Sequence, residues 1–147
     1  MKKLILSAAI TVTLFFSAFA NNDKAGRQLN RDLEAAMKSS KEVQWKHSEN
    51  FSQASFSFNG KPVFAYFDNS DQSLVGYSFH LVNEDIPADF ANAIKTKYAG
   101  WNITEAIMFI DEAGNTNYFA TVQNGKKSLV LKSTGKGRVA IFSKLPV

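Results

Sequence analysis

The sequence contains no cysteine in its 147 residues. It therefore forms no disulfide and offers no cysteine for the lipid attachment of bacterial lipoproteins. Stability must come from packing alone. The 13 phenylalanines, four tyrosines and two tryptophans provide large apolar rings for a core.

Histidine is also scarce, which narrows the range of catalytic and metal-binding functions. The only two histidines are His47 and His80, and neither has the spacing of a nucleophile–base–carboxylate arrangement or of a metal-binding pair. Phosphate-binding and dinucleotide-binding glycine patterns are absent as well. These observations predict a protein that is not an enzyme and that has no catalytic residues, metal site or cofactor.

Carboxylates are present, but their patterns favour ordinary surface positions. Residues 68–71 read Asp-Asn-Ser-Asp and lack the pattern of a calcium-binding loop. Two of the three carboxylates Glu105, Asp111 and Glu112 could be considered as the catalytic pair of a glycosidase. Their expected places in a strand and a turn favour exposed groups instead.

The first 20 residues have the pattern of a secretory signal sequence. Lys2 and Lys3 precede an apolar run over residues 4–16, and Ala18 and Ala20 occupy the positions read by a signal peptidase. The run is shorter than the roughly 20 apolar residues of a membrane-spanning helix. We expect a mature chain of residues 21–147, located in the periplasm or secreted, with no stable membrane anchor after cleavage.

Positive charge is modest once the signal is removed, because 15 lysines and arginines then face 13 acidic residues. Several cations gather near the C-terminus, but no nucleic-acid motif accompanies them. Lysines on strands commonly keep a sheet edge soluble. We therefore expect no nucleic-acid partner.

Two Asn-Gly-Lys triplets, at residues 59–61 and 124–126, each separate two strand-like runs. Asn-Gly is a strong signal for a two-residue hairpin turn. A helical pattern precedes each pair, and the repeat units are predicted at about 27–82 and 85–145. The expected fold is α+β, a tandem repeat of a helix plus a four-stranded antiparallel sheet, forming one compact domain over residues 21–147.

The helices carry the clearest patterns. Leu29, Leu33, Ala36 and Met37 recur at helical spacing after a loose lead-in over residues 21–26. The second helix is expected to follow a capping Asp85, with Pro87 in its first turn.

The two hairpins disagree in one respect. With two-residue turns and an offset of 65 residues, the apolar side chains of the second hairpin lie on the face opposite to those of the first. Either one turn is not of the simple type, or the first hairpin buries Phe64 and Tyr66.

The second unit resembles a known family. Its residues read Ile86-Pro87-x-x-Phe90-x-x-x-Ile94-x-x-x-Tyr98-x-Gly100-Trp101-x-Ile103-x-x-Ala106, followed by an Asp-x-x-Gly-Asn turn at 111–115. This pattern is similar to small exported bacterial proteins called PepSY-like or β-lactamase-inhibitor-like. The resemblance implies tandem helix-plus-four-strand units in a curved antiparallel sheet. It also implies the binding and restraint of another protein, often a secreted hydrolase.

An aromatic face is the best candidate for a binding site. If Ala54, Phe56, Phe58 and Phe67 are buried, Phe64 and Tyr66 point the other way, beside Ser55 and Ser57. Rings among small polar residues suit protein recognition. The alternative is that other parts of the chain cover these rings.

These features predict an exported non-enzymatic binding protein. Its expected partner is another envelope or secreted protein, in particular a periplasmic or secreted hydrolase that it restrains or inhibits. The alternative is a periplasmic carrier of a small molecule or peptide, with a pocket between helices and sheet.

Overall fold

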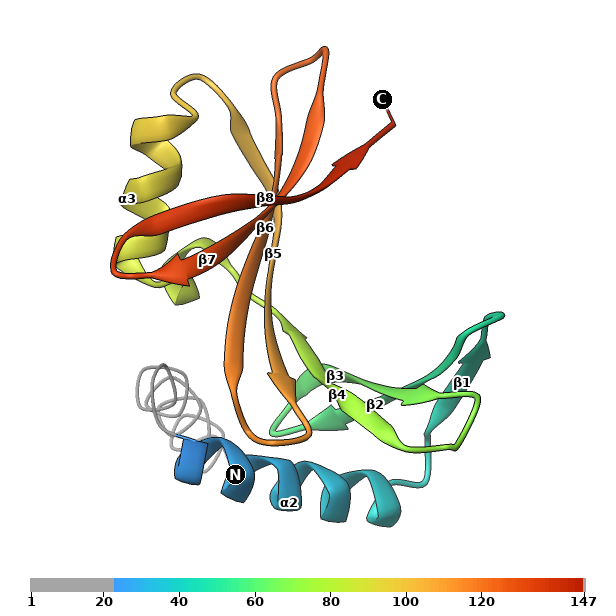
Figure 1. Ribbon diagram of the computed structural model, residues 1–147. Coiled ribbons are helices and arrows are strands. Elements are labelled where there is room, and N and C mark those ends of the chain that lie inside the picture. Colours follow the sequence, from blue (N-terminus) through green and yellow to red (C-terminus); the bar gives the residue numbers. More distant parts are fainter. Residues whose placement is uncertain (1–22, 147) are drawn as a thin grey trace. The chain divides into compact units, whose positions relative to one another are not determined.

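The computed structural model describes residues 23–146, so the predicted signal sequence at residues 1–20 lies outside the described residues. Within this range the protein is α+β, with two α-helices, one short 3₁₀-helix and eight strands (Figure 1). The elements are, in chain order, α2 (Asp23–Ser39), β1 (Gln44–His47), β2 (Phe51–Phe58), β3 (Lys61–Asp68), β4 (Leu74–His80), η1 (Asn83–Asp85), α3 (Ala88–Lys97), β5 (Asn102–Asp111), β6 (Thr116–Gln123), β7 (Ser128–Gly135) and β8 (Arg138–Leu145).

The strands pair in the order in which the chain forms them, from β1 to β8, in one sheet. Short connections give antiparallel pairing of β1 with β2, β2 with β3, β3 with β4, β6 with β7, and β7 with β8. Between β4 and β5 the chain forms η1 and α3. The order of helices and strands agrees with the sequence prediction. That the two halves are copies of one repeated unit stays a prediction.

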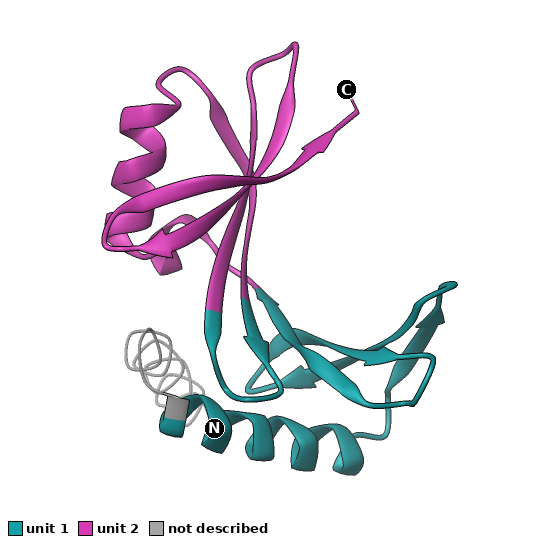
Figure 2. Cartoon of the chain, viewed as in Figure 1, with its two compact units in different colours: residues 1–79, 109–116 teal, residues 80–108, 117–147 magenta. Residues whose placement is uncertain are grey.

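The chain divides into two compact units (Figure 2). Among the described residues, unit 1 comprises 23–79 and 109–116, and unit 2 comprises 80–108 and 117–146. The strands β5 and β6 contribute residues to both units, because the hairpin that joins them belongs to unit 1.

The core of unit 1 lies between α2 and one face of its strands. Leu29 and Leu33 of the helix are buried, as their spacing predicted, and so are side chains of β2 to β4. The helix α2 lies against β2, so this strand face is covered by the helix. The buried strand residues of this face are Ala54, Phe56, Val63, Ala65, Tyr77 and Phe79.

The helix α2 begins earlier than expected. The prediction of a loose lead-in over residues 21–26 is wrong from Asp23 onward, and Gly26 is a buried helical residue. The Asn30 amide on the same helix donates to the carbonyl of Asp111 at 2.8 Å. This bond and the close approach of Gly26 to Gly114 hold the start of the helix against the β5–β6 turn. The tertiary contacts favour a helix where the local sequence does not.

The turn between β2 and β3 is the predicted two-residue hairpin. Phe58 pairs with Lys61, and Asn59 and Gly60 adopt φ values of 50° and 75°. Both values are positive, as a type I′ turn requires. This register buries Ala54 and directs Phe64 and Tyr66 to the other face.

The second Asn-Gly sequence forms a different turn, so the prediction of a second two-residue hairpin is wrong. Gln123 pairs with Ser128, which leaves a four-residue loop. The Asn124 side-chain oxygen accepts hydrogen bonds from the amides of Lys126 at 3.1 Å and Lys127 at 2.9 Å. Two extra loop residues move the offset between equivalent pairs to 66, and this restores the same buried face in both hairpins.

Unit 2 packs α3 against β5 to β8. Phe90 and Ile94 are the buried residues of the helix. Asp85 does not cap it, because residues 83–85 form a 3₁₀ turn of their own, and Pro87 is the residue at the N-cap. Strand side chains complete this core, namely Ala106, Met108, Tyr118, Ala120, Val122, Leu129, Leu131 and Val139.

Candidate functional site

The four residues predicted to bind a partner lie on one face of the β2–β3 hairpin. Ser55 lies directly opposite Phe64, and Ser57 lies opposite Pro62. Tyr66 lies one pair further along the same face, opposite Gln53. This is the face opposite to the buried core of unit 1, and we call it the outer face.

Accessibility differs among these four residues. Ser57 is exposed, whereas Ser55, Phe64 and Tyr66 are half-buried. The two rings are thus neither fully exposed nor part of the core. Their accessible parts stand among small polar side chains, as the sequence interpretation required.

Tyr66 is held at the centre of an aromatic cluster that we define as Phe51, Tyr66 and Phe109. Its ring centre is 6.0 Å from that of Phe51, with an angle of 66° between the ring planes, and 6.3 Å from that of Phe109. The Ser78 hydroxyl donates a hydrogen bond to the phenolic oxygen of Tyr66 at 3.3 Å. Such edge-to-face and tilted arrangements stabilise the position of each ring. Tyr66 therefore presents a fixed surface.

Phe109 reaches this cluster because Gly76 lies beside it. A Cβ atom on Gly76 would be 2.6 Å from Cζ of the Phe109 ring and 2.4 Å from the carbonyl oxygen of Ile110. No side chain other than hydrogen fits in this space. Tyr66 and Gly76 form a pair in the β3–β4 register, so the missing side chain lies next to the tyrosine.

Phe51, Gly76 and Phe109 were not identified from the sequence. The only sequence signal for Phe51 is the alternating pattern of β2, and the structure leaves 44% of this residue exposed on the outer face. Phe109 is 43 positions from Tyr66 along the chain, so only the strand pairing brings the two together.

The surroundings of the cluster are mostly uncharged. Gln53 and Ser55 face outward between the rings, and the nearest register neighbours with charge are Lys46, opposite Gln53, and Asp68, opposite Phe51. Charged residues are depleted at the centre of protein interfaces, and aromatic residues are enriched there. The outer face has this composition.

A second cluster, on the other face of β1 and β2, contains polar groups that resemble a catalytic pair. His47 Nδ1 is 2.8 Å from the Ser52 hydroxyl oxygen, and Ser52 donates to the side-chain oxygen of Asn69 at 2.6 Å. The Asn69 amide nitrogen donates to the carbonyls of Ser48 and Glu49, which fixes its orientation.

This orientation determines the direction of every hydrogen bond in the cluster. Because the Ser52 proton is directed to Asn69, His47 Nδ1 must carry a proton and donate to Ser52. A general base would have to accept from the serine instead. The network therefore closes the β1–β2 turn and does not activate a nucleophile.

The other residues considered for chemistry also have structural contacts. His80 lies 3.2 Å from Glu105, and both side chains are half-exposed. The Asp111 carboxylate accepts from the backbone amide of Asn115 at 2.8 Å and from its side-chain amide at 3.0 Å, and so stabilises the β5–β6 turn. Over residues 23–146 no three His, Asp or Glu side chains are grouped as metal ligands.

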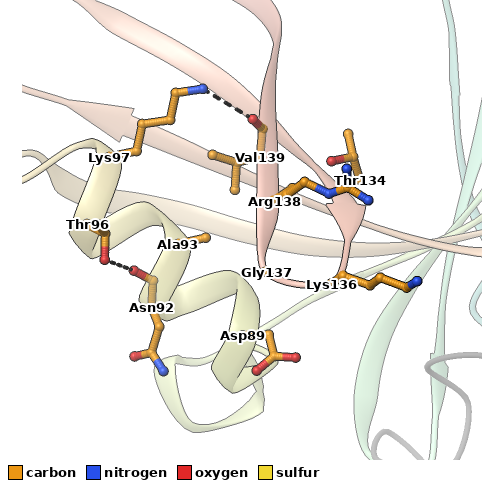
Figure 3. Close-up of a pocket in the computed structure, with 10 residues that line it drawn as sticks. All are labelled: Asp89, Asn92, Ala93, Thr96, Lys97, Thr134, Lys136, Gly137, Arg138 and Val139. Atoms are coloured by element: carbon orange, nitrogen blue, oxygen red, sulfur yellow. Dashed lines mark hydrogen bonds between the residues drawn. The ribbon is translucent and has the colours of Figure 1, made fainter.

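Unit 2 has a groove of about 890 Å³ between α3 and the β7–β8 hairpin (Figure 3). Most of its lining residues have polar or charged side chains, although apolar atoms provide the larger part of its surface, and the polar groups do not converge. Lys97 donates to the carbonyl of Val139 at 3.5 Å, and Thr96 donates to the carbonyl of Asn92 at 2.9 Å, within its own helix. Figure 3 shows Lys136 extending away from α3. The groove lacks the apolar enclosure typical of small-molecule sites.

Neither helix of the described chain has the length and apolar character needed to cross a bilayer.

Solved structures with the same fold come from Bacteroides. A DUF2874 family protein of Bacteroides uniformis has a TM-score of 0.62 and 19% identity, over 82% of this chain and 87% of that one. A BLIP-like protein of Bacteroides fragilis has a TM-score of 0.60 and 15% identity, over 82% and 83%. A Bacteroides eggerthii protein, provisionally described as periplasmic, has a TM-score of 0.61 and 15% identity, over 82% and 86%.

No family model and no curated protein matches the chain. The structural likeness supports the BLIP-like part of the resemblance seen in the sequence, while the PepSY-like part stays a prediction. At these identities the likeness concerns the fold. The chain thus shares the α+β fold of DUF2874 and BLIP-like proteins.

Proposed function

We propose that this chain is an exported binding protein that recognises another envelope or secreted protein through the outer face of unit 1. The observation that carries the proposal is the aromatic cluster around Tyr66, whose rings are fixed by mutual contact and remain partly accessible. Rigid aromatic side chains with neutral polar neighbours supply much of the binding energy in protein interfaces.

The partner class in this proposal is a hydrolase that is restrained by the bound protein. Its support is the likeness to a BLIP-like protein, together with the resemblance of the second unit to β-lactamase-inhibitor-like sequences. A provisionally periplasmic neighbour and the signal-like N-terminus support an exported location. Partner, inhibition and location are all parts of the proposal.

A role as a small-molecule carrier has weaker support. The groove beside α3 is open, and so is a second groove of about 550 Å³ that Ser55 and Ser57 line beside residues 40–44. Both features favour a macromolecular partner over an enclosed ligand.

The test compares two aromatic variants of residues 21–147. Phe51→Ala removes an exposed ring from the outer face, whereas Trp45→Ala removes an exposed ring from the opposite face of the same sheet. Each is used as bait in an envelope extract of the native organism, and the captured protein is then titrated by calorimetry. We expect Phe51→Ala to weaken binding by a factor of about 30, the loss of about 2 kcal/mol typical of a hot spot.

Trp45→Ala should leave the affinity of the captured protein within about twofold of the unchanged chain. Equal losses in both variants would show that the outer face is not the site. Capture of a hydrolase whose activity is unaffected by saturating binding protein would remove inhibition from the proposal and leave the surface in place.

A further inference from the structure

The last strand, β8, has an unusual surface for a sheet edge. It stands at one end of the strand order, so within residues 23–146 its strand partner is β7 alone. Three of its large apolar side chains are exposed, Ile141 at 49%, Phe142 at 63% and Leu145 at 41%. Sheet edges are usually protected from further pairing by shortness, charge, bulges or cover. In β8 a register shift at Phe142 interrupts the pairing with β7, and the apolar side chains are exposed on both sides of it.

Only the first residues of β8 are covered by another part of the chain. Lys97 of α3 donates to the carbonyl of Val139, and Gly137 lies near the main chain of Asp89 (Figure 3). The exposed apolar residues follow after this point. The accessible part of the edge is therefore Ile141–Leu145.

The opposite end of the sheet differs in both length and charge. The strand β1 has four residues and β8 has eight. Residues 41–49, around β1, contain two lysines and two glutamates, whereas residues 113–147 contain six lysines and arginines and no acidic residue. Of the two end strands, β8 alone combines an accessible edge with charges that are all positive.

Charge decides between the occupants that such an edge could accept. Pairing with a second copy would bring together two β8 strands whose charged side chains, Arg138 and Lys144, are all positive. Like charges placed directly opposite each other destabilise a strand pair. The N-terminal residues of the chain begin with Met-Lys-Lys and supply no acidic strand. Neither a second copy nor the N-terminal residues therefore offer negative charge to β8. A segment with acidic side chains does.

We propose that the Ile141–Leu145 edge of β8 binds an extended acidic segment of a partner protein by strand addition. Main-chain hydrogen bonds would extend the sheet by one strand. Ile141 and Lys144 pair with the buried Leu131 and Leu129, whereas Phe142 lies beside Phe119 on the other face of the sheet. Because side chains alternate between faces along a strand, the apolar side chains of the segment would cover Phe142, and its carboxylates would lie near Lys144. This surface is separate from the aromatic cluster of unit 1, and the inference does not rest on the function proposed above.

The first test is direct binding of a short blocked peptide of alternating glutamate and valine, followed by fluorescence anisotropy. A lysine–valine peptide is the charge control, and the same glutamate–valine peptide with N-methylated backbone is the hydrogen-bond control. We expect saturable binding of the unmodified acidic peptide and none of either control. Binding of the N-methylated peptide with equal affinity would overturn strand addition.

Variants locate the binding surface. Lys144→Glu should weaken binding about fivefold to tenfold, because reversal removes one attraction and adds one repulsion of the size measured for exposed pairs. Lys126→Glu, an equal charge change in the β6–β7 turn, should change it less than about twofold. Equal effects of the two variants would overturn the site, because they would indicate general attraction to a basic protein.

Hydrogen exchange of the full complex measures the protection of backbone amides. Main-chain pairing with the peptide changes this protection, whereas attraction between charges alone does not. Peptide binding should slow exchange of amides within Ile141–Leu145. Unchanged exchange there, or protection confined to another strand, would overturn the proposal. Sedimentation at low peptide concentration should show a monomer. A dimer formed through β8 would overturn the proposal, because a second copy would then occupy the edge.

Discussion

Tyr66 lies directly opposite Gly76 on the neighbouring strand, and the space that a Gly76 side chain would fill holds the ring of Phe109. The candidate binding surface thus depends on a residue that contributes no side chain to it. Glycine inside a strand often marks such a close approach. Here the approach places a third ring beside the tyrosine.

The variant Gly76→Ala should destabilise the protein by about 1–3 kcal/mol, the usual range for overpacking a close-packed site. The new methyl group would meet the Ile110 carbonyl oxygen, a backbone atom that cannot move without shifting β5. Urea unfolding measures the change, and the spectrum of the aromatic residues reports displacement of the Phe109 ring. An unfolding midpoint equal to that of the unchanged protein would contradict this packing.

A glycine-to-alanine substitution at Gly26 tests an even closer approach between two parts of the backbone. In an exposed helix interior, replacing glycine by alanine stabilises by about 1 kcal/mol. At Gly26 the added Cβ would be 1.9 Å from the Gly114 carbonyl oxygen, so the sign of the effect should reverse. We expect Gly26→Ala to destabilise by at least about 2 kcal/mol in urea unfolding. Any gain in stability would show that α2 and the β5–β6 turn do not approach this closely.

The sequence predicted those parts of the fold that depend on neighbours along the chain. The periodicity of Leu29 and Leu33, the alternation in β2 and the turn at Asn59-Gly60 each reflect local geometry, and the structure confirms them. Gly26 was placed outside the helix because residues 21–26 are polar and lie at the start of the expected mature chain. Its contact with Gly114 is 88 positions away and leaves no local signal.

The candidate site could be predicted only in part for the same reason. Register follows from the hairpin turn, so the common face of Ser55, Phe64 and Tyr66 was accessible to sequence reasoning. Phe109 and Gly76 join that face through pairing of strands that are distant along the chain. The likeness to BLIP-like structures bears on the fold, and the role of the face stays a prediction.

Replacing asparagine by glycine should affect stability differently in the two Asn-Gly sequences. Asn59 needs only a positive φ, which glycine adopts freely, so Asn59→Gly should change stability by less than about 0.5 kcal/mol. Asn124 uses its side chain to accept two backbone amides, so Asn124→Gly should cost about 1 kcal/mol. Urea unfolding of the two variants gives the comparison directly. Equal changes would mean that both turns are of one type.

The hydroxyl of Tyr77 is buried and has no hydrogen-bond partner among the described residues. The ring itself is well packed, with an edge-to-face contact to Phe56 at 6.4 Å between ring centres. Leaving a buried hydroxyl unpaired costs about 1–3 kcal/mol. Tyr77→Phe removes that cost with little change in shape and should stabilise the protein by about 1 kcal/mol, measured in urea at neutral pH. A loss of stability would indicate that the hydroxyl makes a favourable interaction.

The same residue predicts how stability falls in alkali. Burial, and secondarily the negative charge of Glu34, raises the pKa of Tyr77 from 10.0 to about 12. The folded state therefore favours the protonated phenol more than the unfolded state does. This contribution is fully present below pH 10 and is lost as the pH rises from 10 towards 12.

Tyr77→Phe isolates this contribution, because burial raises the pKa of Tyr118 as well and that tyrosine remains in the variant. Between pH 10 and 12 the free energy of unfolding should fall more steeply in the unchanged protein than in Tyr77→Phe. Urea unfolding at several pH values measures the two slopes. Parallel slopes would contradict the raised pKa, because they would mean that the phenol of Tyr77 ionises equally readily in the folded and unfolded chains.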